Sequence, residues 1–283
     1  MSCDGDIIVR TDARGKGLSS ISRADPDERG DETFWRIDGQ NAQLWYAGNR
    51  NLALYLVDPS RGGDVAVSIF GEDWPGNLVA DDYAGYNPVN PASRQSCLAH
   101  LSRKAKDITQ EILLLPTRLQ ERASLLFCAR LRDFFSECCA LGKARNSGHI
   151  SYSKARARQP ALQRQLEAIC RSALNHPQAE NLRQRLIDPT RDAHRIFTFL
   201  DVNGMEPTNN QAEQSLRLPV IFRKICFGSR STAGAQTFGT NLSLITTAKR
   251  QDRDPLAFLQ TLLLLGPSAA QPLLYRHPLQ DTS

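Results

Sequence analysis

Glu213 is the residue on which most of the possible chemistry depends, and it lies in the polar run Pro207–Pro219. Within that run, Gln211–Leu218 favours a short helix that ends at the second proline, which places the carboxylate in the first helical turn. The Asn210-x-x-Glu213 spacing is typical of a capping box, and Glu213 with Arg217 has the i,i+4 spacing of an ion pair. Spacing alone therefore favours a structural role for this carboxylate.

A longer pattern around Glu213 favours a different use. The chain reads Thr-Asn-Asn-x-Ala-Glu-x-x-Leu-Arg from Thr208, and a proline, an apolar run, Arg-Lys and a Phe-Gly-Ser turn follow. This pattern closely resembles the C-terminal catalytic segment of the insertion sequence 66 family of transposases. The resemblance implies an Asp-Asp-Glu metal site on a ribonuclease H-like fold, with Glu213 as its third member. It also predicts two aspartates upstream, each placed at a strand.

Two aspartates match the family's acidic motifs. The run Asp31-Glu32-Thr33-x-Trp35-Arg36 is similar to the first motif, and Leu78-Val79-Ala80-Asp81-Asp82 is similar to the second. The apolar residues before Asp81 favour a buried strand that ends at the carboxylates. Open α/β sheets commonly place active sites at that end of a strand.

A Cys-x-x-His pair follows the second aspartate, at Cys97 and His100, and resembles a pair found at the same place in the family. Such a pair is only half of a zinc site, and packing at the end of a strand explains it at least as well. We therefore assign it no chemistry.

The three carboxylates would repel one another if they converged without a cation. Oxygen ligands of this kind suit Mg²⁺ or Mn²⁺, and two ions can serve both the attacking and the leaving oxygen of a phosphoryl displacement. As the resemblance implies, Asp31, Asp81 and Glu213 would be catalytic and metal-binding. The reaction would be cleavage of transposon ends and strand transfer into target DNA.

Basic residues concentrate after Glu213, in a chain whose formal net charge is +5. An excess of positive charge in one segment suits a polyanionic partner, although a solvated helix face is the ordinary explanation of such a run. Four side chains are candidates for phosphate contacts: Arg217, Arg223, Lys224 and Arg230. The expected partner is DNA, with a homo-oligomer formed on it and no membrane.

The elements that must position these residues indicate an α/β fold. Residues 33–37, 42–47 and 52–57 read as three antiparallel strands joined by turns. A long region then carries apolar residues at helical spacing. We expect a ribonuclease H-like mixed sheet flanked by helices, with an all-helical insertion between the second Asp and the Glu. The expected parts are a loop or disordered segment at 1–30, core at 31–100, helical insertion at 101–200, core at 201–265 and a tail at 266–283.

The seven cysteines show no paired Cys-x-x-Cys spacing, which argues against a secreted disulfide framework. No signal peptide or membrane-spanning run is visible, so we expect a cytoplasmic protein that associates with the nucleoid when it binds DNA. Two alternatives stay open. One is a truncated, inactive transposase remnant that keeps the fold and a weak DNA-binding surface, and the other is a ribonuclease or junction nuclease on the same fold.

Overall fold

The computed structural model describes residues 27–270, without the side chains of 266–270. The strands are β1 (Asp27–Ile37), β2 (Gln40–Gly48), β3 (Ala53–Asp58), β4 (Asp73–Ala80) and β5 (Asn90–Ser96). The helices are α1 (Gly63–Phe70), α2 (Leu98–Leu113), α3 (Arg122–Asn146), α4 (Tyr152–Arg156), α5 (Gln159–Ile169), α6 (Pro177–Ile187), α7 (Thr198–Asp201), α8 (Asn210–Cys226), α9 (Thr232–Arg250) and α10 (Pro255–Ala270). Short 3₁₀ turns occupy Ala84–Tyr86 and Thr117–Leu119.

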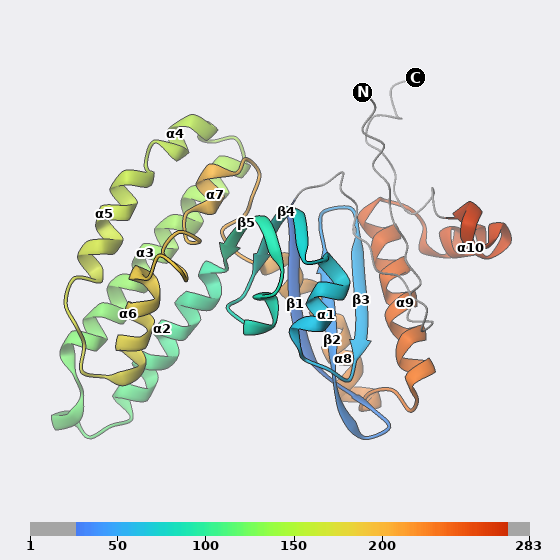
Figure 1. Cartoon of the computed structure of the whole chain (residues 1–283), viewed down its shortest axis with the longest axis horizontal. Helices are drawn as coiled ribbons and strands as arrows, with labels where there is room; N and C mark the ends of the chain where they lie inside the picture. Colours follow the sequence, from blue (N-terminus) through green and yellow to red (C-terminus); the bar gives the residue numbers. More distant parts are fainter. Residues whose placement is uncertain (1–26, 271–283) are drawn as a thin grey trace. The chain divides into compact units, whose positions relative to one another are not determined.

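The strands form one sheet in the order β3-β2-β1-β4-β5 (Figure 1). β1 pairs antiparallel with β2, and β2 pairs antiparallel with β3, which confirms the three-stranded meander expected from the sequence. In this register Asp31 lies opposite Tyr46. Alternation along the strands then divides the side chains between two faces of the sheet.

The chain divides into two compact units. Among the described residues, the first comprises 27–78, Tyr83–Ala92 and 210–270, and it holds most of the sheet together with α1, α8, α9 and α10. The second comprises Val79–Asp82 and Ser93–Asn209, and it holds α2 to α7. In the sequence, α2 to α7 therefore lie between the second aspartate and the glutamate.

The core of the first unit lies on one face of the sheet. Its buried residues include Trp35 of β1, Leu44 of β2 and Tyr55 of β3, and they pack against Leu216 of α8 and Leu242 of α9. On the opposite face α1 covers the sheet (Figure 1), and an aromatic cluster forms there from Trp45, Phe70, Trp74, Tyr83 and Tyr86. Trp35 and Trp45 are both almost completely buried and belong to the core.

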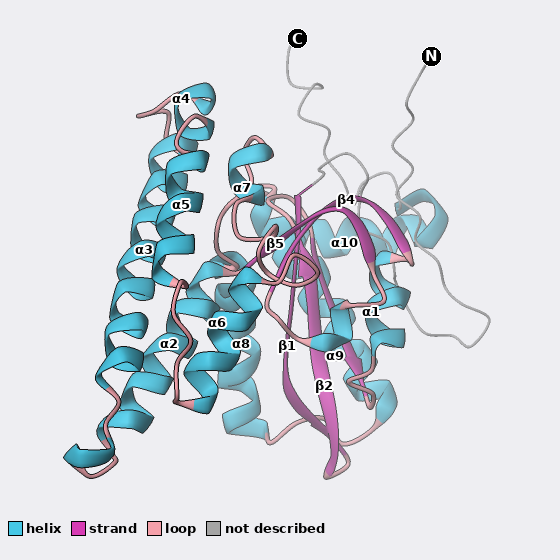
Figure 2. Ribbon diagram, turned by 60° about the vertical axis from the view of Figure 1, so that its left-hand side comes forward, coloured by secondary structure: helices cyan, strands magenta, loops and turns pink. Residues whose placement is uncertain are grey.

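The second unit is a helical bundle with its own core (Figure 2). Apolar residues of α2 and α3 meet at helical spacing and bury Ile108, Leu131 and Phe134 almost completely. α5 and α6 add Leu162 and Leu182 to the same cluster. Within residues 27–270, no helix combines the length and the apolar character that crossing a bilayer requires.

Candidate active site

Asp31 lies in the middle of β1, and the strand begins earlier than the sequence indicated. We expected residues up to 30 to form a loop or to be disordered, but the strand starts at Asp27. The polar residues before Asp31 are buried and contact distant groups: Asn49 donates to the Glu28 carboxylate at 2.9 Å, and Arg29 donates to the Gln211 side chain. Residues 1–26 of the expected loop lie outside the described part of the chain.

Asp31 is 9% exposed, and its Oδ1 accepts a hydrogen bond from the Glu32 backbone N–H at 2.9 Å. Pairing with β2 on one side fixes the backbone at this position. The aspartate is therefore held on a rigid element, as a catalytic carboxylate requires.

Glu213 lies in the first turn of α8, as expected, but the helix is longer than expected. It starts at Asn210, continues through Pro219 and ends at Cys226. Because Asn210 is already the first helical residue, Glu213 is four rather than three positions after the capping position, and the capping-box spacing does not apply. The capping box therefore does not explain the position of Glu213.

The helix continues through Pro219 because another group replaces the hydrogen bond that proline cannot make. Proline has no N–H to donate to the carbonyl four residues earlier, which belongs to Ser215. The Tyr55 hydroxyl of β3 donates to that carbonyl at 3.0 Å. Pro219 itself is buried on the same helical face as Ala212 and Leu216, against the sheet.

Asp31 and Glu213 belong to the same unit, and residues close to each of them in the sequence contact one another. Arg29 precedes Asp31 by two residues, so both side chains leave the same face of the sheet. Arg29 contacts Gln211, which precedes Glu213 by two residues in α8, and the Gln211 amide also donates to the Asn49 carbonyl at 2.9 Å. The first turn of α8 is thereby fixed on the face that carries Asp31.

Asp81 and Asp82 directly follow β4 and belong to the second unit. Arg185 contacts the Asp82 carboxylate at 2.5 Å and also contacts Asp192, which is buried and accepts from the Ser96 hydroxyl at 2.6 Å. Burial raises the pKa of Asp82, and the charge of Arg185 acts against that rise. Asp82 is therefore engaged with an arginine of its own unit.

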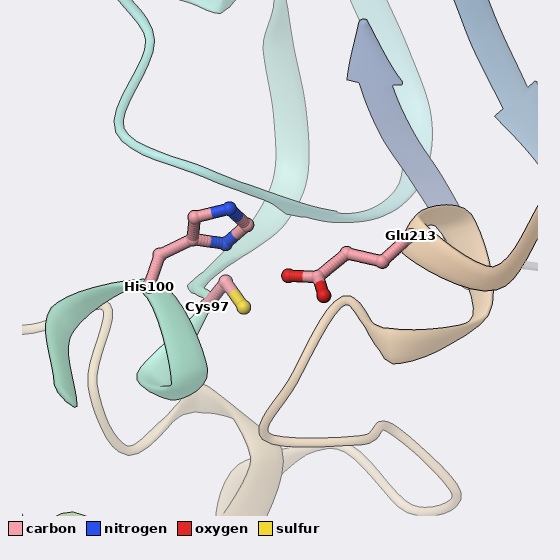
Figure 3. Close-up of side chains that lie close together, drawn as sticks. All are labelled: Cys97, His100 and Glu213. Carbon is pink, nitrogen blue, oxygen red and sulfur yellow. The ribbon is translucent and has the colours of Figure 1, made fainter. Parts of the chain in front are cut away.

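Cys97 and His100 lie at the start of α2, as Figure 3 shows. Cys97 occupies the capping position, and its Sγ accepts a hydrogen bond from the Asn209 backbone N–H at 3.1 Å. This contact gives the buried thiol a packing role.

The four candidate phosphate-binding residues differ in their surroundings. Arg217, Lys224 and Arg230 are exposed. Arg223 is half-buried and donates to the Phe34 carbonyl and, at 3.3 Å, to the Thr33 hydroxyl of β1. The side chain of Arg223 therefore ties α8 to β1, a role that its position in a basic run did not reveal.

Two further residues support the site and were not identified from the sequence. Arg29 could have been found from its alternation with Asp31 on a strand, had the strand been expected there. Arg185 could not, because nothing in the sequence near Asp82 indicates an arginine from a distant helix.

A family model described as Transposase IS66 family matches residues 23–237, well over half of the chain. No curated protein and no solved structure matches.

Proposed function

Because the chain belongs to the IS66 family of transposases, we propose that it is an Asp-Asp-Glu catalytic domain that cleaves transposon ends and joins them to target DNA. The observation that carries this proposal is the position of two of the three carboxylates. Asp31 lies in the middle of β1, and Glu213 lies in the first turn of a helix fixed to the same face of the sheet. Asp81 follows β4, the strand next to β1 in the sheet order.

The donor set fits a hard divalent cation. Asp31, Asp81 and Glu213 offer only carboxylate oxygens, the ligands that Mg²⁺ and Mn²⁺ prefer, and three such groups need a cation if they are to converge in their charged forms. Two bound ions would supply charge stabilisation to the attacking and leaving oxygens of the phosphodiester. The sheet order and the helical unit support a ribonuclease H-like fold with a helical insertion as part of the proposal.

The protein's own residues would hold the reacting groups. Asp31, Asp81 and Glu213 would bind the metal, while Arg185 keeps Asp82 out of the ligand set. Arg217, Lys224 and Arg230 would contact DNA phosphates without reading the base sequence. In the first reaction water would attack a phosphodiester at the element's end and displace the 3′-oxygen of the element as a free hydroxyl. In the second, this 3′-hydroxyl would attack a phosphodiester of target DNA and displace a 3′-oxygen of the target strand. A homo-oligomer assembled on DNA would bring two ends together.

The test is thermal unfolding of the full chain with and without Mn²⁺. A ligand at about a hundred times its dissociation constant stabilises by roughly 2.7 kcal/mol, so the wild type should unfold at a higher temperature with the metal. Asp81→Asn and Glu213→Gln should lose this shift. Asp82→Asn is the matched control: it removes the same charge beside Asp81, lowers stability by breaking the contact with Arg185, and should keep the shift.

A shift that survives in both Asp81→Asn and Glu213→Gln would show that the metal binds elsewhere and would contradict the proposed ligand set. No shift in the wild type would favour an inactive remnant. When the shift behaves as expected, nicking and strand transfer on duplex DNA should require Mg²⁺ or Mn²⁺ and should be lost in the same two variants.

A further inference from the structure

A groove of about 400 Å³ lies between α2 and α3 in the helical unit. It exists because small residues recur at helical spacing on both helices: Ala99 and Ser102 on α2, and Ser136 and Cys139 on α3. Larger side chains at these positions would fill the space. The buried ring of Phe135 lies beneath, so the floor of the groove is rigid.

Three cations line the same groove, namely Arg103 and Lys106 from α2 and Arg132 from α3. Arg103 and Lys106 are three residues apart, which places them on one face of their helix. None of the groove's lining residues is acidic. Among residues 27–270, Lys106 and Arg132 form no ion pair with a carboxylate.

A groove with this lining favours an anion of a particular kind. Cations gathered around one space repel one another, and a bound anion removes that cost. The serine hydroxyls can donate hydrogen bonds to oxygen atoms that lie between the helices. The groove is open and elongated along two helices rather than enclosed, which suits a phosphate within a polymer better than a small metabolite that must be surrounded.

We propose that this groove binds backbone phosphates of duplex DNA, as a second contact surface separate from the catalytic carboxylates. The inference rests on the proposed function, because it takes DNA as the substrate and adds where the helical unit contacts it. Such contacts position the duplex without reading its sequence. Each phosphate neutralised in this way adds about 0.9 to the slope of the logarithm of affinity against the logarithm of salt concentration.

The test measures binding of the full chain to a labelled duplex by fluorescence anisotropy, with EDTA present so that metal binding plays no part. The variant carries Lys106→Glu and Arg132→Glu. The matched control carries Lys104→Glu and Arg130→Glu, two exposed cations on the same helices that do not line the groove. Both double variants change the net charge equally, and thermal unfolding checks that each is folded.

We expect the groove variant to lose at least tenfold in affinity for duplexes of any sequence and to lower the salt slope by about 2. The control should lose no more than about threefold and keep the slope. Equal losses in the two variants would reveal a general charge effect and overturn the inference, as would a groove variant that binds like the wild type. Stabilisation by inorganic phosphate without duplex binding would mean that the ligand is a small anion, which also overturns it.

The two proposals can fail separately. A Mn²⁺-induced shift that depends on Asp81 and Glu213, together with an unchanged groove variant, would leave the catalytic site intact and remove only the groove. A wild type without a Mn²⁺-induced shift, together with a groove variant that loses DNA affinity as expected, would remove the catalytic site and leave the groove.

Discussion

The Tyr55 hydroxyl donates a hydrogen bond to the Ser215 carbonyl, the group that Pro219 leaves without an intrahelical donor. The two residues are 160 positions apart in the chain. A strand of the sheet thus compensates for a proline within the helix that carries Glu213. The position of the proposed catalytic glutamate depends on this compensation, since the first turns of α8 and its continuation share one helix axis.

Removal of the hydroxyl tests that dependence. Tyr55→Phe leaves a partly buried carbonyl without its donor and should lower the free energy of unfolding by about 1–3 kcal/mol. In a Pro219→Ala background the new backbone N–H can serve the carbonyl, so the same change should cost clearly less. Urea unfolding of the four proteins in this double-mutant cycle gives the coupling directly. Equal costs in both backgrounds would show that the hydroxyl does not act through the proline.

Replacement of Gly228, in the turn after α8, is predicted to lower the stability of the fold. Its φ is +118°, and a Cβ there would lie 2.5 Å from the Arg36 carbonyl oxygen. Gly228→Ala should therefore destabilise the fold by about 1–3 kcal/mol. Gly39→Ala is the control, because its φ is also positive at +73° but nothing lies within 4 Å of its Cβ. Thermal unfolding should show a larger loss for Gly228, and a matching loss for both would assign the whole cost to φ.

Arg223 and Lys224 are neighbours with different predicted roles. Arg223→Ala removes donors to the Phe34 carbonyl and should lower stability by about 1–3 kcal/mol. Lys224→Ala removes an exposed charge and should change stability by less than about 0.5 kcal/mol. Its effect should instead be a uniform loss of DNA affinity with a salt slope lower by about 1. A sequence-selective loss for Lys224→Ala would contradict a phosphate contact.

Glu180 should make the stability of the helical unit depend on pH. Arg183 donates to its carboxylate at 2.7 and 2.6 Å, and this hydrogen bonding lowers the pKa of Glu180 to about 2. Because the folded pKa is lowered, the contribution is present above the unfolded value near 4.3 and is lost as pH falls toward 2. Glu180→Gln should cost at most about 1 kcal/mol at pH 7, since the pair is partly exposed.

The measurement is urea unfolding of the wild type and Glu180→Gln at pH 7, 5, 4 and 3. The difference between the two proteins should be steady down to about pH 5 and should shrink at pH 4 and 3. A difference that stays constant to pH 3 would mean that the charge of Glu180 contributes nothing.

Local patterns predicted the elements that local physics determines. The alternating residues of β2 and β3 and the helical spacing in α2 and α3 indicated their structures correctly, because each element buries one regular face. The start of β1 was missed because Glu28 and Arg29 are polar, and their partners Asn49 and Gln211 come from other parts of the chain. The full length of α8 was missed for the same reason, since Tyr55 supplies what the sequence near Pro219 lacks.

The candidate site was predictable to a similar extent. The motif around Glu213 and the strand before Asp81 placed both residues at the ends of elements, where the structure has them. The ion pair of Asp82 was not predictable, because its partner Arg185 comes from the distant helix α6. The local sequence predicts which helix or strand carries a carboxylate. Tertiary contacts decide which of two neighbouring carboxylates pairs with a distant arginine.

In the sequence, segments of the first unit come both before and after the helical unit, and this order has a consequence during synthesis. β1 to β3 leave the ribosome early, yet the helices that cover their core face, α8 and α9, follow only after the whole stretch Ser93–Asn209 has been translated. At about 5–20 residues per second this delay is on the order of ten seconds. The nascent sheet therefore presents an uncovered apolar face throughout that interval, and the helical unit can complete its own core first.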